Sequence, residues 1–187
     1  VDKLYISHLV YSGRGKDNLE IDISKEQRKE YVEFIIDKAF EYYKNGNNID
    51  LVTGNMEMDA IMLLNRFKKE YPDFVETLEE KLKTWGGNSA GHRLGNMDWA
   101  GNVKPDPFFP FVVGNYLQTP FDEIWTSTSN EILNKLREHP RQIKGRCAQC
   151  KYIDICNGGS RSRAYAISGD LWEEDPSCYL TLEETRR

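Results

Sequence analysis

The placement of cysteine constrains this chain more than any other feature of its sequence. All four cysteines fall within the last 41 of its 187 residues, and the first 146 residues contain none. They are Cys147, Cys150, Cys156 and Cys178, with the spacing Cys-x2-Cys-x5-Cys and then 21 residues before the fourth. Disulfide-stapled secreted domains spread their cysteines through the fold, and the N-terminus lacks the layout of a signal peptide. The pattern therefore predicts a cytoplasmic protein whose thiols stay reduced.

Four thiolates close together form the usual ligand set of a 4Fe-4S cluster or of a structural zinc ion. Structural zinc commonly uses two Cys-x2-Cys pairs facing each other, whereas three of these cysteines fall within ten residues and the fourth stands alone. The spacing favours an iron-sulfur cluster, with zinc and metal-free thiols as alternatives. Gly158 and Gly159 support the first interpretation, because glycine lets backbone N–H groups approach inorganic sulfur.

Composition excludes two other classes of protein. The net charge of -5 argues against a general nucleic-acid binder, which needs a basic excess, and no apolar run reaches the ~18 residues of a membrane span. The charge is reversed locally, since residues 141–165 contain six basic side chains and one acidic side chain. This excess could neutralise the thiolates of a cluster, or its arginines could recognise a polycarboxylate or phosphate. Both interpretations stay open.

Ahead of the cysteines, the sequence alternates strand and helix patterns. The expected elements are strands at 4–11 and 49–53 and helices at 24–43, 58–71 and 73–85. Ser24 followed by Gln27 forms the capping-box signature of the first helix. From Gly86 onward glycine, asparagine and short apolar runs predict a loop-rich α+β part. We therefore expect a domain at 1–85 and a second at 86–187.

Three local features of the second part can be predicted. Residues 96–103 suggest two strands that turn around 100–102. Thr128 with Glu131 three residues later predicts the start of a helix. A further short helix is expected at 160–168, ending before a glycine.

The cysteine region resembles the SPASM-type C-terminal extension of radical S-adenosylmethionine (SAM) enzymes. The resemblance rests on Cys147-x2-Cys150-x5-Cys156-x3-Ser160-x17-Cys178, with Gly169-Asp170 and Asp175-Pro176-Ser177 downstream. The extension usually holds two auxiliary clusters, and Asn88, Asp106 and Ser160 stand where the first takes cysteines. All four ligands of the second are present. The resemblance thus implies one auxiliary 4Fe-4S cluster held by the four cysteines.

Within that superfamily, three segments are most similar to the modified-tetrapyrrole enzymes of the NirJ/AhbC family. They are residues 9–15 (Leu-Val-Tyr-Ser-Gly-Arg-Gly), 105–107 (Pro-Asp-Pro) and 157–164 (Asn-Gly-Gly-Ser-Arg-Ser-Arg-Ala). The family implies a partial barrel that holds S-adenosylmethionine and a catalytic 4Fe-4S cluster and uses an external electron donor. A 5'-deoxyadenosyl radical then attacks a side chain of an iron tetrapyrrole that bears carboxylates. No membrane or nucleic-acid partner is implied.

The Cys-x3-Cys-x2-Cys loop that binds such a catalytic cluster is absent from these residues. Residues 1–85 are therefore expected to be an α/β remnant, the last strand–helix unit or units of a partial TIM-like barrel. Residues 86–187 would follow as a small, loop-rich SPASM-like iron-sulfur domain. We expect this chain to need an N-terminal radical SAM core and to be inactive without it.

Five residues are candidates for substrate contact, and each also has a structural interpretation. Arg14 follows the first strand, where barrel ligands usually bind, but could be a turn residue. His92 could ligate the substrate iron or be a plain loop residue. Asp106, between two prolines, could face the substrate or only form a turn. Arg161 and Arg163 belong to the basic excess described above.

Two functions follow from the sequence. The first is the auxiliary-cluster part of a radical SAM enzyme of haem or haem d-type biosynthesis. The alternative is a non-enzymatic zinc- or iron-sulfur-stabilised module for electron transfer or partner binding. His8, in an apolar strand, is expected to be a core histidine with satisfied hydrogen bonds.

Overall fold

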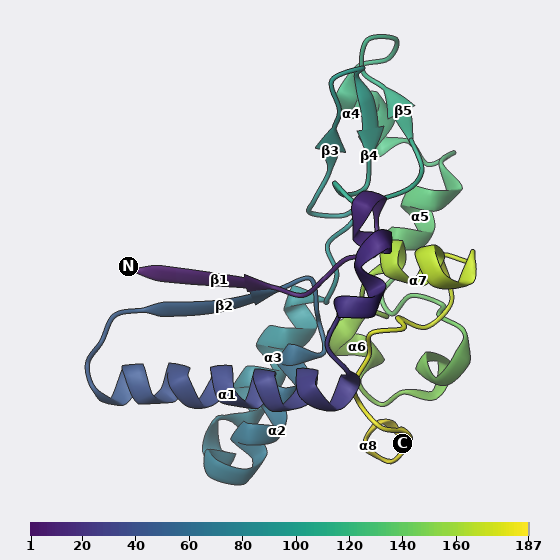
Figure 1. Cartoon of the computed structure of the whole chain (residues 1–187). Coiled ribbons are helices and arrows are strands. Elements are labelled where there is room, and N and C mark those ends of the chain that lie inside the picture. Colours follow the sequence, from purple (N-terminus) through teal and green to yellow (C-terminus); the bar gives the residue numbers. More distant parts are fainter. Residues whose placement is uncertain (187) are drawn as a thin grey trace.

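The first part of the chain is a parallel strand–helix–strand unit. The computed structural model describes residues 1–186. Strand β1 (Lys3–Ser7) pairs in parallel with β2 (Asp50–Gly54), with Lys3 opposite Asp50, and α1 (Lys25–Lys44) connects them (Figure 1). The expected strand at 4–11 ends early, at Ser7. The 3-10 helix η1 (Gly13–Ile21) follows and leads the chain back to the start of α1.

Helix α1 begins as its sequence signature predicts. The Ser24 hydroxyl accepts a hydrogen bond from the Gln27 amide at 3.2 Å, and the Gln27 side chain accepts one from the Ser24 amide at 2.9 Å. These two bonds satisfy amides that have no partner inside the helix. The capping box is therefore confirmed. The helix buries Val32, Ile35 and Ile36 on one face.

Two further helices complete the first part. Helix α2 (Asp59–Glu70) and helix α3 (Val75–Trp85) are separated by the 3-10 turn η2 (Pro72–Phe74), as the proline predicts. Helix α3 ends at Gly86, whose φ of +71° is the left-handed conformation that glycine adopts most easily. Both expected helices are confirmed.

The second part begins with a small antiparallel sheet. Strands β3 (Asn96–Met97), β4 (Asn102–Lys104) and β5 (Gly114–Asn115) form it at the end of the molecule far from α2 (Figure 1). The expected turn around 100–102 joins β3 to β4 and is confirmed. Two short helices, α4 (Phe121–Thr126) and α5 (Glu131–Arg137), follow. The cap of α5 is Asn130 rather than Thr128, because the Asn130 side chain accepts the Leu133 amide.

The C-terminal segment is mostly loop, with four short helical turns. They are the 3-10 turn η3 (Gly145–Gln149) and helices α6 (Ile153–Cys156), α7 (Arg161–Ser168) and α8 (Leu182–Thr185). Ser160 caps α7 and Gly169 ends it, as expected. Among residues 1–186, no helix is long and apolar enough to cross a membrane.

The main hydrophobic core joins both parts of the chain. Val32 from α1 and Ile61 and Leu64 from α2 belong to one buried cluster with Cys156 and Tyr179. The C-terminal segment thus packs against the strand–helix unit, and the two expected domains share a core. This packing places Cys150, Cys156 and Cys178 in the same buried cluster as Met56 and Met58, which follow β2.

Candidate metal centre and adjoining pocket

The structure brings the four cysteines together from two separate segments. Cys147, Cys150 and Cys156 come from the η3–α6 segment, and Cys178 comes from the chain that leads to α8. All four are unpaired thiols with 6–8 % of their surface exposed, and all four line one small cavity. Within the described part of the chain, no three His, Cys, Asp or Glu side chains could hold a single metal ion. The four thiols therefore share this one cavity.

A left-handed turn after α6 shapes one wall of this cavity. Asn157, Gly158 and Gly159 all have positive φ, at +50°, +85° and +69°. A Cβ on Gly158 would lie 2.6 Å from a carbon of Ile143, so the chain passes too closely for any larger residue. The Gly159 amide donates a hydrogen bond to the Cys156 carbonyl at 3.0 Å, and the Gly158 backbone close to the Cys156 sulfur favours the thiolate.

The thiols of Cys147, Cys156 and Cys178 resist ionisation because they are buried. Burial, followed by the charge of Cys178, raises the pKa of Cys147 to about 12. Burial also raises the pKa of Cys156 well above its usual value and raises that of Cys178. Because metals bind thiolates, loading this cavity has to release protons.

Arg146 fixes the segment that contains Cys178. Its guanidinium donates to the carbonyls of Leu180 at 2.6 Å and Cys178 at 3.0 Å, and to the Glu174 carboxylate at 3.0 Å. Arg146 also lines the thiol cavity. The sequence showed this arginine only as part of a basic excess, and the structure gives it a defined position beside the thiols.

Arg161 and Arg163 are buried and bonded to the protein itself. Arg161 donates to the carbonyls of Gly158, Leu171 and Glu173. Arg163 forms a fully buried ion pair with Asp175, at 2.9 and 2.7 Å to its two carboxylate oxygens. These contacts occupy both guanidinium groups within the protein; neutralisation of a cluster and contact with a substrate both stay predictions.

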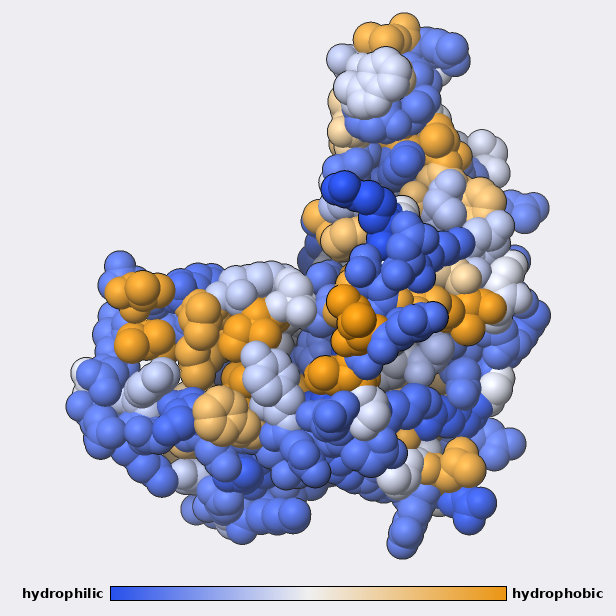
Figure 2. Space-filling view, in the orientation of Figure 1, coloured by the Kyte–Doolittle hydropathy of each residue, from blue (hydrophilic) through white to orange (hydrophobic). Residues whose placement is uncertain are grey.

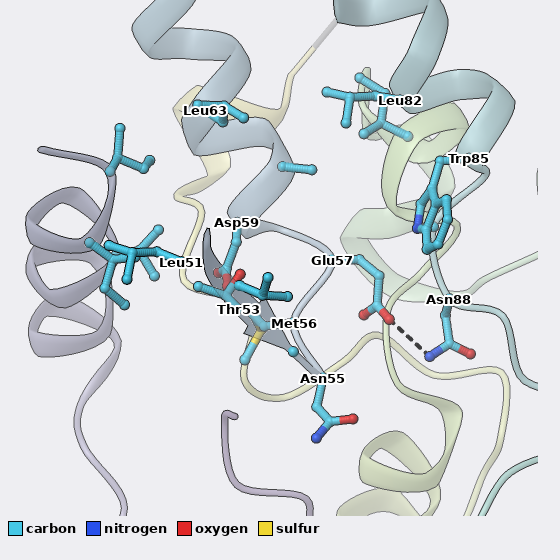
Figure 3. A pocket seen from close by; sticks show the side chains of 18 of the residues that line it. Leu51, Thr53, Asn55, Met56, Glu57, Asp59, Leu63, Leu82, Trp85 and Asn88 are labelled. Carbon is cyan, nitrogen blue, oxygen red and sulfur yellow. Dashed lines mark hydrogen bonds between the residues drawn. The ribbon is translucent and has the colours of Figure 1, made fainter. Parts of the chain in front are cut away.

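A larger pocket opens beside the thiol cavity, with a volume of about 970 Å³. Apolar side chains of α1, α2 and α3 line most of it, together with Tyr5 of β1 and residues 51–54 of β2, and residues 55–57 line it directly after β2 ends (Figure 3). Figure 2 shows apolar side chains gathered on the same side of the molecule, over the two strands. In parallel sheets and barrels, ligands usually bind beyond the carboxyl ends of the strands, so this pocket is the second candidate site.

The three positions that replace cysteines of the first SPASM cluster all line this pocket. Asn88, Asp106 and Ser160 come from distant parts of the chain and meet at its polar end. Asp106 is 7 % exposed and accepts a hydrogen bond from the Phe108 amide at 2.7 Å, and burial raises its pKa. The three positions that the sequence singled out therefore line the same pocket.

Glu57 also lines this polar end, and sequence reasoning missed it. One carboxylate oxygen accepts a hydrogen bond from the Asn88 amide at 2.9 Å (Figure 3). The other oxygen is buried and has no partner among the described residues. Burial raises the pKa of Glu57. Its position three residues after β2 is the sequence signal that could have identified it.

The other two candidates lie elsewhere. Arg14 is exposed in η1 and His92 is exposed in the loop before β3, and neither lines the pocket. Partial burial and the neighbouring Arg93 lower the pKa of His92. The structure therefore brings Asp106 to the pocket but leaves Arg14 and His92 outside it, and a substrate contact by either stays a prediction.

Replacing Glu57 by glutamine should stabilise the protein. The Glu57→Gln variant keeps the acceptor for Asn88 and removes a buried charge without a partner, so we expect the free energy of unfolding at pH 7 to rise by about 1 kcal/mol. Because the folded-state pKa is raised, the wild-type protein loses stability as pH rises above the unfolded pKa of about 4.3, and the gain should grow with pH.

Urea unfolding at pH 4 and pH 7 measures this effect. The matched control is Glu79→Gln, which neutralises an exposed carboxylate that pairs with Lys83 at 2.7 Å and should show no gain. A Glu57→Gln variant less stable than wild type at pH 7 would mean that the carboxylate has a stabilising partner.

Comparison with known proteins gives two relatives that match nearly the whole chain and others that match part of it. "Pre-heme d1 synthase" of Dinoroseobacter shibae is 42% identical over 188 residues, covering 99% of this chain and 46% of its own length. "Fe-coproporphyrin III synthase" of Methanosarcina barkeri is 36% identical, covering 98% of this chain and 47% of its own length. "AdoMet-dependent heme synthase" of the same organism is 44% identical over 109 residues, which is 55% of this chain and 30% of that protein. No family model and no solved structure matches.

These relatives belong to the radical SAM class of proteins. Within that class, the chain belongs to the NirJ/AhbC family, as its sequence motifs predict. The chain spans about half the length of the curated relatives it matches.

Proposed function

We propose that this chain is the auxiliary-cluster part of a radical SAM enzyme of haem biosynthesis. The observation that carries the proposal is the set of four buried, unpaired thiols that line one cavity. Relatives named for pre-heme d1, Fe-coproporphyrin III and heme synthesis support the pathway.

The spacing of the cysteines supports a 4Fe-4S cluster over a zinc ion. Structural zinc commonly uses two Cys-x2-Cys pairs, whereas Cys147, Cys150 and Cys156 fall within ten residues and Cys178 stands alone. In a 4Fe-4S cluster each of four thiolates binds a different iron, and the four cysteines that line one cavity supply that donor set.

The chain supplies the surroundings that such a cluster needs. The Tyr152 amide donates a hydrogen bond to the Cys150 sulfur at 3.5 Å, and the backbones of Gly158 and Leu180 lie close to the sulfurs of Cys156 and Cys178. Arg146 provides positive charge at the cavity wall. Buried apolar side chains limit the access of water. The bound cluster would supply a centre for electron transfer, and these donors and charges would tune it.

We further propose that the 970 Å³ pocket binds the iron tetrapyrrole substrate. The pocket lies at the upper end of the volume range of small-molecule sites and is largely apolar, as a macrocycle requires. Glu57, Asn88 and Asp106 would orient the substrate through hydrogen bonds. S-adenosylmethionine, the catalytic cluster and the electron donor would act from outside these 187 residues, because the loop that binds the catalytic cluster is absent here.

Metal analysis of the anaerobically purified chain tests the cluster assignment. After reconstitution with iron and sulfide, we expect about four irons and four sulfides per chain and a brown protein. A colourless protein with one tightly bound zinc ion would contradict the cluster and favour the non-enzymatic module. Parallel loading with zinc alone provides the comparison.

A further inference from the structure

A chain of buried hydrogen bonds starts at Tyr179, the residue directly after Cys178. The Tyr179 hydroxyl donates to one oxygen of Asp59 at 2.8 Å. The other Asp59 oxygen lies 2.9 Å from Nε2 of His8, and Nδ1 of His8 lies 3.0 Å from the Arg28 guanidinium. The hydrogen-bonded atoms of this series are buried, and the series crosses from the C-terminal segment to α2, to His8 directly after β1, and to α1.

The series of hydrogen bonds continues and returns to Ser177, the residue directly before Cys178. Arg28 donates to the Asp22 carboxylate at 2.8 Å, and the Tyr11 hydroxyl donates to the same oxygen at 2.7 Å. The Ser177 hydroxyl in turn donates to the Tyr11 hydroxyl at 2.9 Å. The hydrogen bonds therefore form a closed ring in which Cys178 lies between the two end residues.

The chemistry of arginine fixes the direction of these bonds. A guanidinium has no acceptor, so Nδ1 of His8 accepts from Arg28 and the ring proton lies on Nε2. His8 is then a neutral donor to Asp59. It is a core histidine with both nitrogens hydrogen-bonded, as the sequence predicts. Asp59 thus receives two neutral donors and keeps a buried negative charge.

Asp59 lies close to the thiol cavity and to the strand ends. Its neighbour Met58 lines the cavity, and Asp59 begins α2 (Figure 3). The amide of His8 donates to the Gly54 carbonyl at 3.1 Å, which extends the pairing of β1 with β2. The ring therefore links Cys178 to the carboxyl ends of both strands.

We propose that His8 and Asp59 are positioning residues that act through Tyr179 to fix Cys178 as a cluster ligand and to set the electron affinity of the cluster. The inference rests on the proposed function. The side-chain hydrogen bonds of Ser177 and Tyr179 hold the backbone on both sides of Cys178, so the Cys178 sulfur points in one direction. The Asp59 charge acts across a buried interior, where charges interact more strongly than in water.

Two substitutions in the 187-residue chain separate these effects. Asp59→Asn removes a negative charge at nearly constant shape; its one oxygen still accepts from Tyr179, and its NH2 group replaces the oxygen that faces His8, so this one hydrogen bond is lost as well. The reduced cluster carries one more negative charge than the oxidised cluster, so the midpoint potential should shift to a more positive value. Tyr179→Phe breaks the ring at Cys178, so the cluster should be lost to a chelator severalfold faster.

Tyr152→Phe is the matched control. Tyr152 lies in the same buried core two residues after Cys150, and its hydroxyl bonds to the neutral Asn65 at 3.2 Å, outside the ring. This variant should keep both the potential and the rate of cluster loss. Redox titration followed by electron paramagnetic resonance measures the potential, and the decay of visible absorbance with a chelator measures the loss. Far-ultraviolet circular dichroism confirms that each variant is folded.

The outcomes distinguish this inference from the proposed function. A wild-type chain that takes up no iron and sulfide overturns the proposed function and the inference with it. If the wild-type chain takes up the cluster but the Asp59→Asn variant has the same midpoint potential as the wild type, only the proposed charge effect is overturned. Equal rates of cluster loss in Tyr179→Phe and Tyr152→Phe would show that the ring does not position Cys178.

Discussion

Replacing Cys156 by alanine is expected to abolish retention of the cluster and to loosen the second half of the chain. Cys156 ends α6, is 6 % exposed and receives hydrogen bonds from the turn that follows it. Removing one thiolate leaves an iron without its ligand. Because few regular elements order this region, metal binding should be coupled to its folding.

Iron and sulfide analysis, together with near-ultraviolet circular dichroism, measures both effects. The matched control is Ile153→Val on the same short helix, which removes one buried methylene and should cost about 1 kcal/mol while keeping the metal. A Cys156→Ala chain with unchanged iron and sulfide would contradict the ligand assignment. If the thiols were metal-free, the variant should resemble the Ile153→Val control instead.

Breaking the Arg163–Asp175 pair should produce the largest loss of stability. The two side chains are 0 % and 1 % exposed, so Arg163→Met leaves a carboxylate in the interior without its cation. The expected loss in the free energy of unfolding is about 3–5 kcal/mol. Asp175 also accepts the amides of Ser160 at 2.8 Å and Ser177 at 3.0 Å, so both loops beside the thiols should loosen.

The loss should depend on pH. Burial opposes ionisation of Asp175, but Arg163 outweighs it and lowers the pKa of that carboxyl. The stabilisation by the Arg163–Asp175 pair is therefore present above about pH 3.9, the pKa of Asp in the unfolded chain. It is lost as the pH falls through the lower pKa that Asp175 has in the folded protein. In Arg163→Met the unpaired carboxyl should take up a proton more readily, so the difference from wild type should shrink in acid.

Urea unfolding at pH 7 and at pH 4 tests this prediction. Lys144→Met is the control, because Lys144 pairs with Asp170 in solvent, with the lysine side chain 60 % exposed. Exposed pairs of this kind contribute little, so the control should unfold like wild type. Equal stability of both variants would mean that the buried pair contributes no more than the exposed one.

Local features were the ones that the sequence could predict. Two residues three positions apart, Ser24 and Gln27, determine the capping box, and one glycine determines the end of α7. The sequence predicted the end of β1 too late in the chain, because an apolar loop residue such as Val10 can be as buried as a strand residue. The cap of α5 was misplaced, because Asn130 and Thr128 are both good caps and only the path of the chain decides between them.

Long-range contacts decided what the chemically active side chains do. Sequence counted Arg161 and Arg163 as part of a basic excess that could neutralise a cluster or bind a ligand, and neither spacing nor composition shows which atoms a guanidinium meets. In the structure Arg163 meets Asp175 and the Leu9 carbonyl, 154 positions away. Glu57 belongs to no sequence motif, because its position in the site depends on a contact with Asn88, which lies 31 positions further along the chain.

The sequence by itself determined the order of strands and helices, the four-cysteine set and the family, because these depend on short spacings along one chain. The tertiary structure alone decided that the four thiols share a cavity, that Asn88, Asp106 and Ser160 meet in one pocket, and that a ring of hydrogen bonds encloses Cys178. Burial, hydrogen bonding and charge pairing depend on which distant segments pack together, and here the shared core of both halves brings them into contact.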